Sequence, residues 1–455
     1  MSESDVQVEN LWTPQGWLHA AGVRIARGRI AEIGQGDARF SGMSGRFVLP
    51  GMPNLHSHAF QRAMAGLAER RGSHSGQDSF WTWRETMYGF ASRVGPDELR
   101  AIAAQLYVEM LKAGYSHVCE FHYLHHVPDG KPYADPAAMS LAIIEAAREV
   151  GIGLTLLPVL YMTGGFDGRP LSERQRRFGM DAESYLRLLE RLRAQESPML
   201  RVGVALHSLR AVPEAALTEV LASAVARAGV VHIHIAEQIG EVEECVATRG
   251  ARPVRWLFDH AEVDARWCLV HATHLDRGEV ESIAGSGAVA GLCPTTEANL
   301  GDGLFPLAGY LDADGVLGIG SDSQISVSPV EELRWLEYGQ RLIARQRNIV
   351  ARSAGVSVGE VLWRAALRGG WQASGLAPFG SGARADLLVL DAQSPLLAAR
   401  TQENALDSFI FAGNTPLVRD VMVNGEWVVR DFRHRDEARI AARFRSSVEA
   451  LAGHA

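Results

Sequence analysis

The stretch that decides the fold is Val48–His58, which reads VLPGMPNLHSH. It is typical of an apolar strand that enters through a Pro-Gly turn and ends in two histidines spaced one residue apart. Residues i and i+2 of a strand point to the same side, so His56 and His58 can converge on one point. Two converging imidazoles suit a zinc-type ion, for which histidine is a common ligand. A lone His-x-His is a weak signal, so its meaning depends on the rest of the chain.

The composition of the 455 residues is that of an ordinary globular protein, long enough for one large domain and a small one. The net charge of −8 gives no basic footprint for nucleic acid or an anionic membrane. No apolar run is long enough to span a bilayer, and the acidic, polar N-terminus is wrong for a signal peptide. The four cysteines lie far apart without a CxxC pair. We therefore expect a cytoplasmic protein with reduced thiols and a small-molecule partner, without nucleic-acid or membrane partners.

Both ends of the chain predict β structure. The first fifty residues contain four short alternating segments separated by glycine-containing turns. Near the other end, 385–391 is typical of a strand and 418–429 of a hairpin around Asn424-Gly425. We expect one small β-sandwich domain, with a C-terminal helix, formed by residues 1–50 and 379–455.

The central segment, 51–378, alternates helical patterns with short apolar strands. The predicted helices cover 97–113, 136–150, 182–195, 213–228 and 330–348. The predicted strands cover 115–120, 153–160, 202–206, 230–235, 268–271, 288–292 and 316–319. Repeated βα units favour a (β/α)₈ barrel, whose functional residues gather at the carboxyl ends of the strands. A doubly wound sheet is the alternative, but no GxGxxG follows the first strand. The polar segment 164–177 is predicted to be a long loop and a candidate cover for an active site.

Polar side chains end five strands of this predicted barrel. They are His56 with His58, His207 with Arg210, His232 and His234 with Glu237, His271, and Asp322. Single histidines on apolar strands are usually core residues, but five strand ends of this kind favour a metal site. Three imidazoles and one carboxylate suit a catalytic Zn²⁺ or Fe²⁺ with one position left for water. Such an ion lowers the pKa of water to about 7, and Glu237 is then a candidate proton carrier.

Several of these motifs together resemble the amidohydrolase superfamily. They are the run 50–58, the late His-x-x-Glu, the isolated histidine, Gly-Ser-Asp at 320–322, GARADL at 382–387 and VNG at 423–425. The resemblance covers nearly the whole chain. It implies a (β/α)₈ barrel with a β-sandwich from both termini, and metal-assisted hydrolysis at carbon.

The resemblance also bears on the number of metal ions. Many members of the superfamily hold two metals bridged by a carboxylated lysine from a barrel strand. The two lysines of this chain do not suit that role, because Lys112 lies in a predicted helix and Lys131 in a Gly-Lys-Pro loop. A bridging glutamate is an open alternative, but none is well placed at a strand end. The His-x-x-Glu pattern instead resembles the single-metal deaminase branch.

By this resemblance, one divalent ion, Zn²⁺ or alternatively Fe²⁺, has four ligands: His56, His58, His234 and Asp322. His232 is the weaker candidate, because the spacing to Glu237 fits His234. The resemblance further implies that Asp322 accepts the proton of the attacking water, that His271 orients it, and that Glu237 carries the proton to the leaving nitrogen. It also suggests a homodimer.

The segments 59–62, 81–85 and 119–126 resemble those members of the branch that deaminate an acyclic amidine derived from glutamate. Such a dicarboxylate suits arginine, which pairs with carboxylates in bidentate fashion. The candidate substrate contacts are Gln61, Arg84, Tyr123, His207 and Arg210. Two of them have alternatives: His207 can simply pack, and Arg84, expected in the first long loop, can form a surface ion pair with Glu85. The histidines at 122, 125 and 126 suit neither a strand nor a helix face and are predicted to be loop structure.

Two other classes stay open at this point. One is a related hydrolase acting on a heterocycle such as guanine or a thioadenosine, for which a pocket of stacking aromatic residues would be expected in place of paired arginines. The other is a non-catalytic scaffold on an inherited barrel. That class typically lacks metal ligands, whereas this chain carries every expected one.

Overall fold

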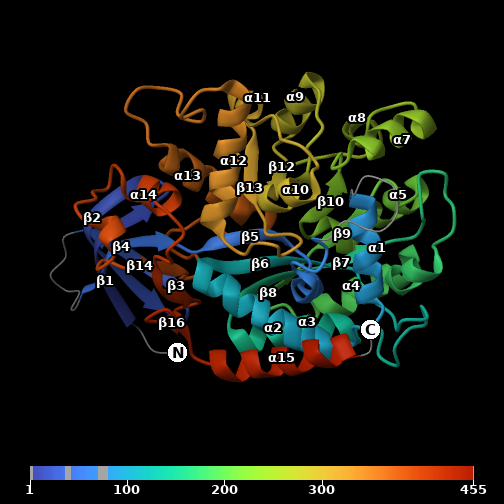
Figure 1. The fold of residues 1–455 in the computed structure, drawn as a ribbon, viewed down its shortest axis with the longest axis horizontal. Coiled ribbons are helices and arrows are strands. Elements are labelled where there is room, and N and C mark those ends of the chain that lie inside the picture. The colour runs from blue at the N-terminus through green and yellow to red at the C-terminus, as the bar shows by residue number, and fades with distance from the viewer. Residues whose placement is uncertain (1–3, 36–42, 70–79, 454–455) are drawn as a thin grey trace.

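A computed structural model describes residues 4–35, 43–69 and 80–453 of the chain. Its strands form two separate sheets. Figure 1 shows the N-terminal strands in blue beside C-terminal strands in red and orange, and the barrel of the central segment next to them. The predicted architecture, a (β/α)₈ barrel with a small β unit from both termini, is confirmed.

The barrel consists of parallel strands that follow one another in chain order. They are β5 (Met52–Ser57), β6 (Tyr115–His122), β7 (Gly153–Leu160), β9 (Val204–Ser208), β10 (Val231–Ile235), β11 (Trp267–His271), β12 (Val289–Leu292) and β13 (Val316–Ile319). The predicted strand 202–206 is interrupted at Gly203, which separates β8 (Leu200–Val202) from β9. A Cβ at Gly203 would lie 2.6 Å from Leu157 Cδ2, so a larger residue has no room at this irregularity.

The first and last barrel strands close the barrel beside the predicted metal ligands. Ser57 and Asp322 form a parallel bridge. The amide of His58 donates to the carbonyl of Asp322 at 3.2 Å, and the amide of Asp322 donates to the carbonyl of His56 at 3.0 Å. Residues more than 260 positions apart therefore meet as backbone neighbours. Their side chains emerge at the carboxyl end of the barrel, where barrel enzymes carry their active sites.

The second sheet joins the two ends of the chain. Its strands, in hydrogen-bonding order, are β17 (Arg433–His434), β16 (Glu426–Arg430), β15 (Val418–Val423), β14 (Leu387–Leu390), β4 (Met43–Pro50), β1 (Ser4–Thr13), β2 (Gly16–Ala26) and β3 (Arg29–Gln35). The N-terminal and C-terminal parts meet where Val48 pairs with Val389. Strand β4 passes directly into β5 through Gly51, where a Cβ would lie 2.2 Å from Ser116 Oγ. The sequence VLPGMPNLHSH thus connects the two sheets.

Helices and short 3₁₀ turns cover the barrel and fill its connections. They are η1 (Ala59–Met64), α1 (Phe80–Ala91), α2 (Pro96–Ala113), α3 (Ala138–Val150), η2 (Glu173–Phe178), α4 (Ala182–Arg193), α5 (Glu214–Ala222), α6 (Ala224–Arg227), α7 (Ile239–Arg249), α8 (Pro253–His260), α9 (Arg277–Ser286), α10 (Pro294–Leu300), α11 (Leu307–Asp312), α12 (Pro329–Ala344), α13 (Val358–Ala373), η3 (Pro395–Leu397), α14 (Ala405–Phe411) and α15 (Glu437–Gly453). The predicted helix 213–228 is divided, because Ser223 is extended (ψ 147°) and its side chain caps α6.

The C-terminal helix α15 runs beneath α2 and α3 in Figure 1. Three ion pairs attach it to these barrel helices: Lys112 Nζ to Glu437 Oε1 at 2.6 Å, and Arg439 and Arg443 to Glu149 at 2.6 Å and 2.9 Å. Helix α15 therefore contacts the barrel, although it comes directly after the last strand of the terminal sheet in sequence.

Two expectations from the composition bear on this fold. All four cysteines are buried and free. In the described part of the chain, no helix combines the length and apolarity needed to cross a membrane.

Candidate metal and substrate site

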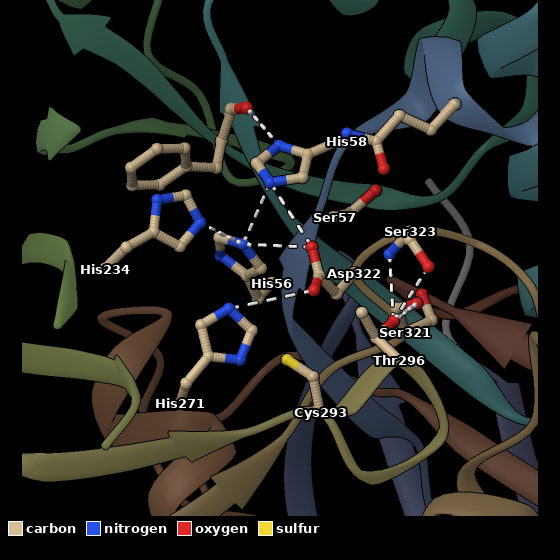
Figure 2. A network of polar contacts seen from close by, with 12 residues as sticks. His56, Ser57, His58, His234, His271, Cys293, Thr296, Ser321, Asp322 and Ser323 are labelled. Carbon is tan, nitrogen blue, oxygen red and sulfur yellow. Dashed lines mark hydrogen bonds and ion pairs between the residues drawn. The ribbon is translucent and has the colours of Figure 1, made fainter. Parts of the chain in front are cut away.

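Three imidazoles and one carboxylate meet at the carboxyl end of the barrel (Figure 2). His56 Nε2 lies 3.2 Å from His58 Nε2 and 2.9 Å from His234 Nε2. Asp322 Oδ1 lies 3.4 Å from His56 Nε2 and 3.3 Å from His58 Nε2. All four side chains are buried. The structure thus brings together the four side chains that were predicted as metal ligands.

Backbone carbonyls decide which nitrogen carries the proton in two of these rings. His58 Nδ1 lies 2.8 Å from the carbonyl of Phe121, and His234 Nδ1 lies 3.0 Å from the carbonyl of His207. A carbonyl only accepts, so each Nδ1 donates and each Nε2 presents a lone pair. Burial lowers the pKa of both histidines, which keeps the rings neutral.

These lone pairs test whether a metal fits the site. The Nε2 atoms of His58 and His234 both face His56 Nε2 at hydrogen-bond distance, and a carboxylate oxygen joins them. A hydrogen on His56 Nε2 can satisfy only one of these acceptors, so the remaining lone pairs and the carboxylate repel one another unless a cation lies between them. Three nitrogen donors and one carboxylate are the ligands that Zn²⁺ and Fe²⁺ accept. The donor set therefore fits one divalent metal ion.

Glu237 and His271 lie beside this cluster. His271 Nε2 is 3.7 Å from Glu237 Oε1 and 3.8 Å from Asp322 Oδ2. Burial raises the pKa of Glu237 to about 7; the charge of His271 opposes this rise and that of Asp322 adds to it. A carboxyl group with a pKa near neutrality can take up and release a proton. The arrangement can therefore move a proton between Asp322, His271 and Glu237.

A buried glutamate supports His271 from its other nitrogen. Glu297, on α10, has Oε1 3.3 Å from His271 Nδ1 and accepts the amide hydrogen of Cys293 at 2.8 Å. Burial alone would lower the pKa of His271, but Glu237, the hydrogen bond to Glu297 and Asp322 together raise it well above its usual value. His271 itself, the last residue of β11, has a left-handed backbone (φ +68°), which is uncommon for a residue other than glycine. Sequence reasoning missed Glu297, although it follows the predicted strand 288–292 by only a few residues.

The five predicted substrate contacts line one pocket together with Glu237 and His271: Gln61, Arg84, Tyr123, His207 and Arg210. Gln61 Nε2 donates to the Tyr123 hydroxyl at 2.9 Å, and its buried Oε1 accepts no hydrogen bond from the described residues. The His207 ring packs 4.4 Å, centroid to centroid, from Tyr161.

The expected position of Arg84 was wrong. It lies on helix α1 rather than in a loop, and its guanidinium carbon is 5.5 Å from the ring centroid of Tyr88. Glu85, its alternative partner, forms an ion pair with Arg174 at 2.6 Å. The helix turns Arg84 toward the pocket and Glu85 toward the surface, because consecutive helical residues face different directions.

Three of the remaining histidines bond to backbone carbonyls, whereas His122 ends strand β6, where a loop was predicted, and its buried Nε2 has no hydrogen-bond partner among the described residues. His232 Nε2 lies 2.9 Å from the carbonyl of Ala373, away from the metal cluster. His125 Nε2 and His126 Nε2 lie 2.9 Å and 2.7 Å from the carbonyls of Val159 and Gly179. The pocket also contains aromatic residues that sequence reasoning did not single out: Trp83, Tyr88, Tyr161 and Phe178. Only Tyr161, directly after β7, stood at a strand end where a signal was available.

Three histidines, an aspartate and a glutamate with a pKa of about 7 meet at the strand ends of this (β/α)₈ barrel. This is the architecture of a metal-dependent hydrolase. The chain belongs to the amidohydrolase family, whose family model matches residues 47–428.

Named relatives share most of the chain. It is 55% identical to a formimidoylglutamate deiminase from Pseudomonas aeruginosa, over 97% of this chain and 98% of that one. It is 27% identical to an 8-oxoguanine deaminase from the same organism, over 97% of both chains. It is 25% identical to a 5-methylthioadenosine/S-adenosylhomocysteine deaminase from Natronomonas pharaonis, over 95% of this chain and 93% of that one.

Solved structures repeat the fold. The crystal structure of an amidohydrolase from Brucella melitensis superposes with a TM-score of 0.93 at 45% identity, covering 98% of this chain and 99% of that one. An adenosine deaminase from Xanthomonas campestris superposes with a TM-score of 0.81 at 21% identity, covering 99% and 98% of the two chains, which is a likeness of fold alone.

Proposed function

We propose that the protein hydrolyses N-formimidoyl-L-glutamate to N-formyl-L-glutamate and ammonia, a step of histidine degradation. The observation that carries this proposal is the 55% identity, over nearly the full length of both chains, to a formimidoylglutamate deiminase. The relatives that act on heterocycles reach only 25–27% identity. The enzyme is a hydrolase that cleaves a linear amidine C–N bond.

The charges of the pocket suit such a substrate. Arg84 and Arg210 line the same pocket, and a planar guanidinium pairs with a carboxylate in bidentate fashion. Gln61 Oε1 is a buried acceptor, and an amidine N–H group is the kind of donor that satisfies it. Tyr123 and His207 complete the proposed contacts. Two cationic groups and one amide acceptor thus match the two carboxylates and the amidine of the substrate.

One divalent metal ion, Zn²⁺ by preference, is the proposed cofactor. Its proposed ligands are the four clustered side chains His56, His58, His234 and Asp322. The chemistry that such a cation supplies when bound is an acidified water, with a pKa of about 7.

The surrounding side chains handle the protons. Asp322 accepts the proton of the attacking water, and His271 orients that water through Nε2, which lies 3.8 Å from Asp322 Oδ2. The water oxygen adds to the amidine carbon. Glu237, with its pKa near 7, protonates the amidine nitrogen, and Asp322 passes the proton of the water to the same nitrogen. The C–N bond then breaks, ammonia leaves, and the hydrogen of the new hydroxyl group returns to Glu237 as the C=O bond forms.

One observation favours a second candidate, a deaminase of a heterocycle. Several aromatic residues line the pocket, and a planar base could stack on them. Both arginines also line the pocket, however, and a neutral base has no carboxylate for their guanidinium groups to bind. Direct competition between the two substrates in an assay of ammonia release separates the candidates: turnover of 5-methylthioadenosine without turnover of formimidoylglutamate would reverse our preference.

We also propose a homodimer that acts in the cytoplasm. The dimer is suggested by the family resemblance, and the location by the four buried cysteines, which form no disulfide. Light scattering of the purified protein tests whether it is a dimer. Metal analysis by mass spectrometry tests whether the bound metal is zinc or iron.

A further inference from the structure

We propose that Tyr88 and Tyr161 form a pair of hydroxyl donors for one carboxylate of the substrate, and that Gln175 is the residue that directs them. The inference rests on the proposed function, because it concerns the dicarboxylate substrate of the same pocket. It assigns a role to three residues that the reaction described above does not use.

The three side chains come from different elements and meet beside the pocket. Tyr88 lies on α1, Tyr161 directly follows β7, and Gln175 lies in η2. Gln175 Nε2 is 3.2 Å from the Tyr88 hydroxyl and 3.0 Å from the Tyr161 hydroxyl. All three side chains are buried, and both tyrosines line the pocket with Arg84 and Arg210.

The direction of the Gln175 amide follows from its other contact. The backbone N–H of Ser172 donates to Gln175 Oε1 at 3.0 Å, as part of the capping box of η2. An N–H group can donate only to the oxygen of the amide, so the NH₂ group must face the tyrosines. Gln175 therefore donates one hydrogen to each phenol oxygen, and both phenols are acceptors in this contact.

The phenol hydrogens are consequently left for a third group. A hydroxyl group that accepts a hydrogen bond from Gln175 still has its own hydrogen to donate. Among the described residues, none accepts that hydrogen from Tyr88 or Tyr161. Burial raises the pKa of Tyr88 well above its usual value, with a further rise from Tyr161 and opposing effects of Arg84 and Arg210, so the phenol stays protonated at neutral pH. Two such donors beside two guanidinium groups fit an acceptor that is anionic and lacks hydrogens of its own. A carboxylate is that group.

The same contacts indicate that the segment 164–177 positions helix α1, which is a different function from covering the site. Gln175 joins this segment to the tyrosine on α1, and Arg174 joins it to Glu85 on the same helix at 2.6 Å. Since Arg84 is carried by α1, the segment holds in place the helix that supplies both an arginine and a tyrosine to the pocket.

Conservative variants test the hydroxyl pair. Tyr88→Phe and Tyr161→Phe should each raise KM for N-formimidoyl-L-glutamate about tenfold, because each removes one hydrogen bond to a charged acceptor, while kcat falls less than about threefold. Tyr338→Phe, which alters a 38% exposed tyrosine of α12 that does not line the pocket, is the matched control and should leave KM unchanged. The penalty should vanish for the one analogue, N-formimidoyl-4-aminobutyrate or N-formimidoyl-2-aminobutyrate, that lacks the carboxylate bound by the tyrosines.

A double-mutant cycle tests the role of Gln175. Gln175→Glu preserves the capping box but presents only acceptors to the phenols, so their hydrogens turn away from the pocket. We expect KM to rise about tenfold in the wild-type background and less than about twofold in the Tyr88→Phe/Tyr161→Phe background, since coupled residues are not additive. An equal effect in both backgrounds would overturn the directing role.

The assay separates this inference from the proposed function. Wild-type turnover of formimidoylglutamate with an unchanged KM in both phenylalanine variants would overturn the hydroxyl pair alone. A wild-type enzyme that releases no ammonia from formimidoylglutamate would overturn the proposed function, and the inference with it. Thermal unfolding of each variant within a few degrees of the wild type shows that the comparison is made on folded protein.

Discussion

Glu297 Oε1 lies 3.3 Å from His271 Nδ1, while the other ring nitrogen of His271 faces Glu237 and Asp322. The carboxylate accepts a hydrogen bond from the Nδ1–H group and so fixes both the plane of the ring and the direction of Nε2. His271 is thereby held between a buried anion and the reacting groups. The contact explains why a residue on α10 bears on chemistry that takes place at the ends of β10, β11 and β13.

We predict that Glu297→Gln lowers kcat by about 10- to 100-fold with little change in KM, as for other groups that orient a functional histidine. The amide keeps an oxygen for the Cys293 N–H but loses the negative charge that faces His271. Steady-state kinetics measure the effect, and Glu297→Asp should recover part of kcat. A normal kcat in Glu297→Gln would show that His271 needs no such partner.

Glu237→Gln should retain the metal and lose activity by a factor of about 10² to 10⁴, the usual contribution of a general acid–base group. The amide is nearly the same size but cannot deliver the proton that the departing nitrogen requires. Metal content and kcat are measured on the same preparation. Loss of the metal from this variant would instead place Glu237 among the ligands.

His234→Ala should reduce the metal content of the purified protein to a small fraction of one equivalent and abolish ammonia release. His234 presents its Nε2 lone pair to the cluster, and alanine offers no donor. His232→Gln is the matched control from the same strand, because His232 bonds to the carbonyl of Ala373 and not to the cluster. Equal loss of metal in both variants would contradict the ligand set.

Arg210→Lys and Arg84→Lys should raise KM for formimidoylglutamate about 10- to 100-fold, since lysine keeps the charge but loses the bidentate fork. Arg277→Lys, which alters an arginine of α9 with a 93% exposed side chain, is the control. Initial rates over a range of substrate concentrations measure the effect. An unchanged KM in both pocket variants would remove the arginines from substrate binding.

Much of the fold could be predicted because its signals are local. Alternating apolar segments, the Pro-Gly turn before β5 and polar residues at strand ends all appear in short windows of sequence. The clustering of His56, His234 and Asp322 followed from one rule, that parallel strands of a barrel end on the same face. The metal cluster was accordingly the most predictable part of the site.

The rest depended on contacts between distant segments. Nothing near Glu297 or Gln175 indicates that each one faces a pocket residue from another element, because those partners are 14 to 87 residues away. Arg84 was expected in a loop, although the apolar residues of α1 do have helical spacing: Phe80, Trp83, Met87, Tyr88 and Ala91. The predicted strand is likewise divided at Gly203 by close packing, and the predicted helix is divided at Ser223 by a local cap. The apolar pattern on either side of these residues continues and does not indicate the division.

The central claim is that this chain deaminates an acyclic glutamate amidine, and the rate of ammonia release measures it most directly. Metal-replete protein should convert N-formimidoyl-L-glutamate to N-formyl-L-glutamate and one equivalent of ammonia, with kcat/KM of about 10⁴ M⁻¹s⁻¹ or more, in the ordinary range of enzymes. 5-Methylthioadenosine and 8-oxoguanine should give no turnover under the same conditions. Absence of ammonia release from formimidoylglutamate, with a full equivalent of metal bound, would contradict the account.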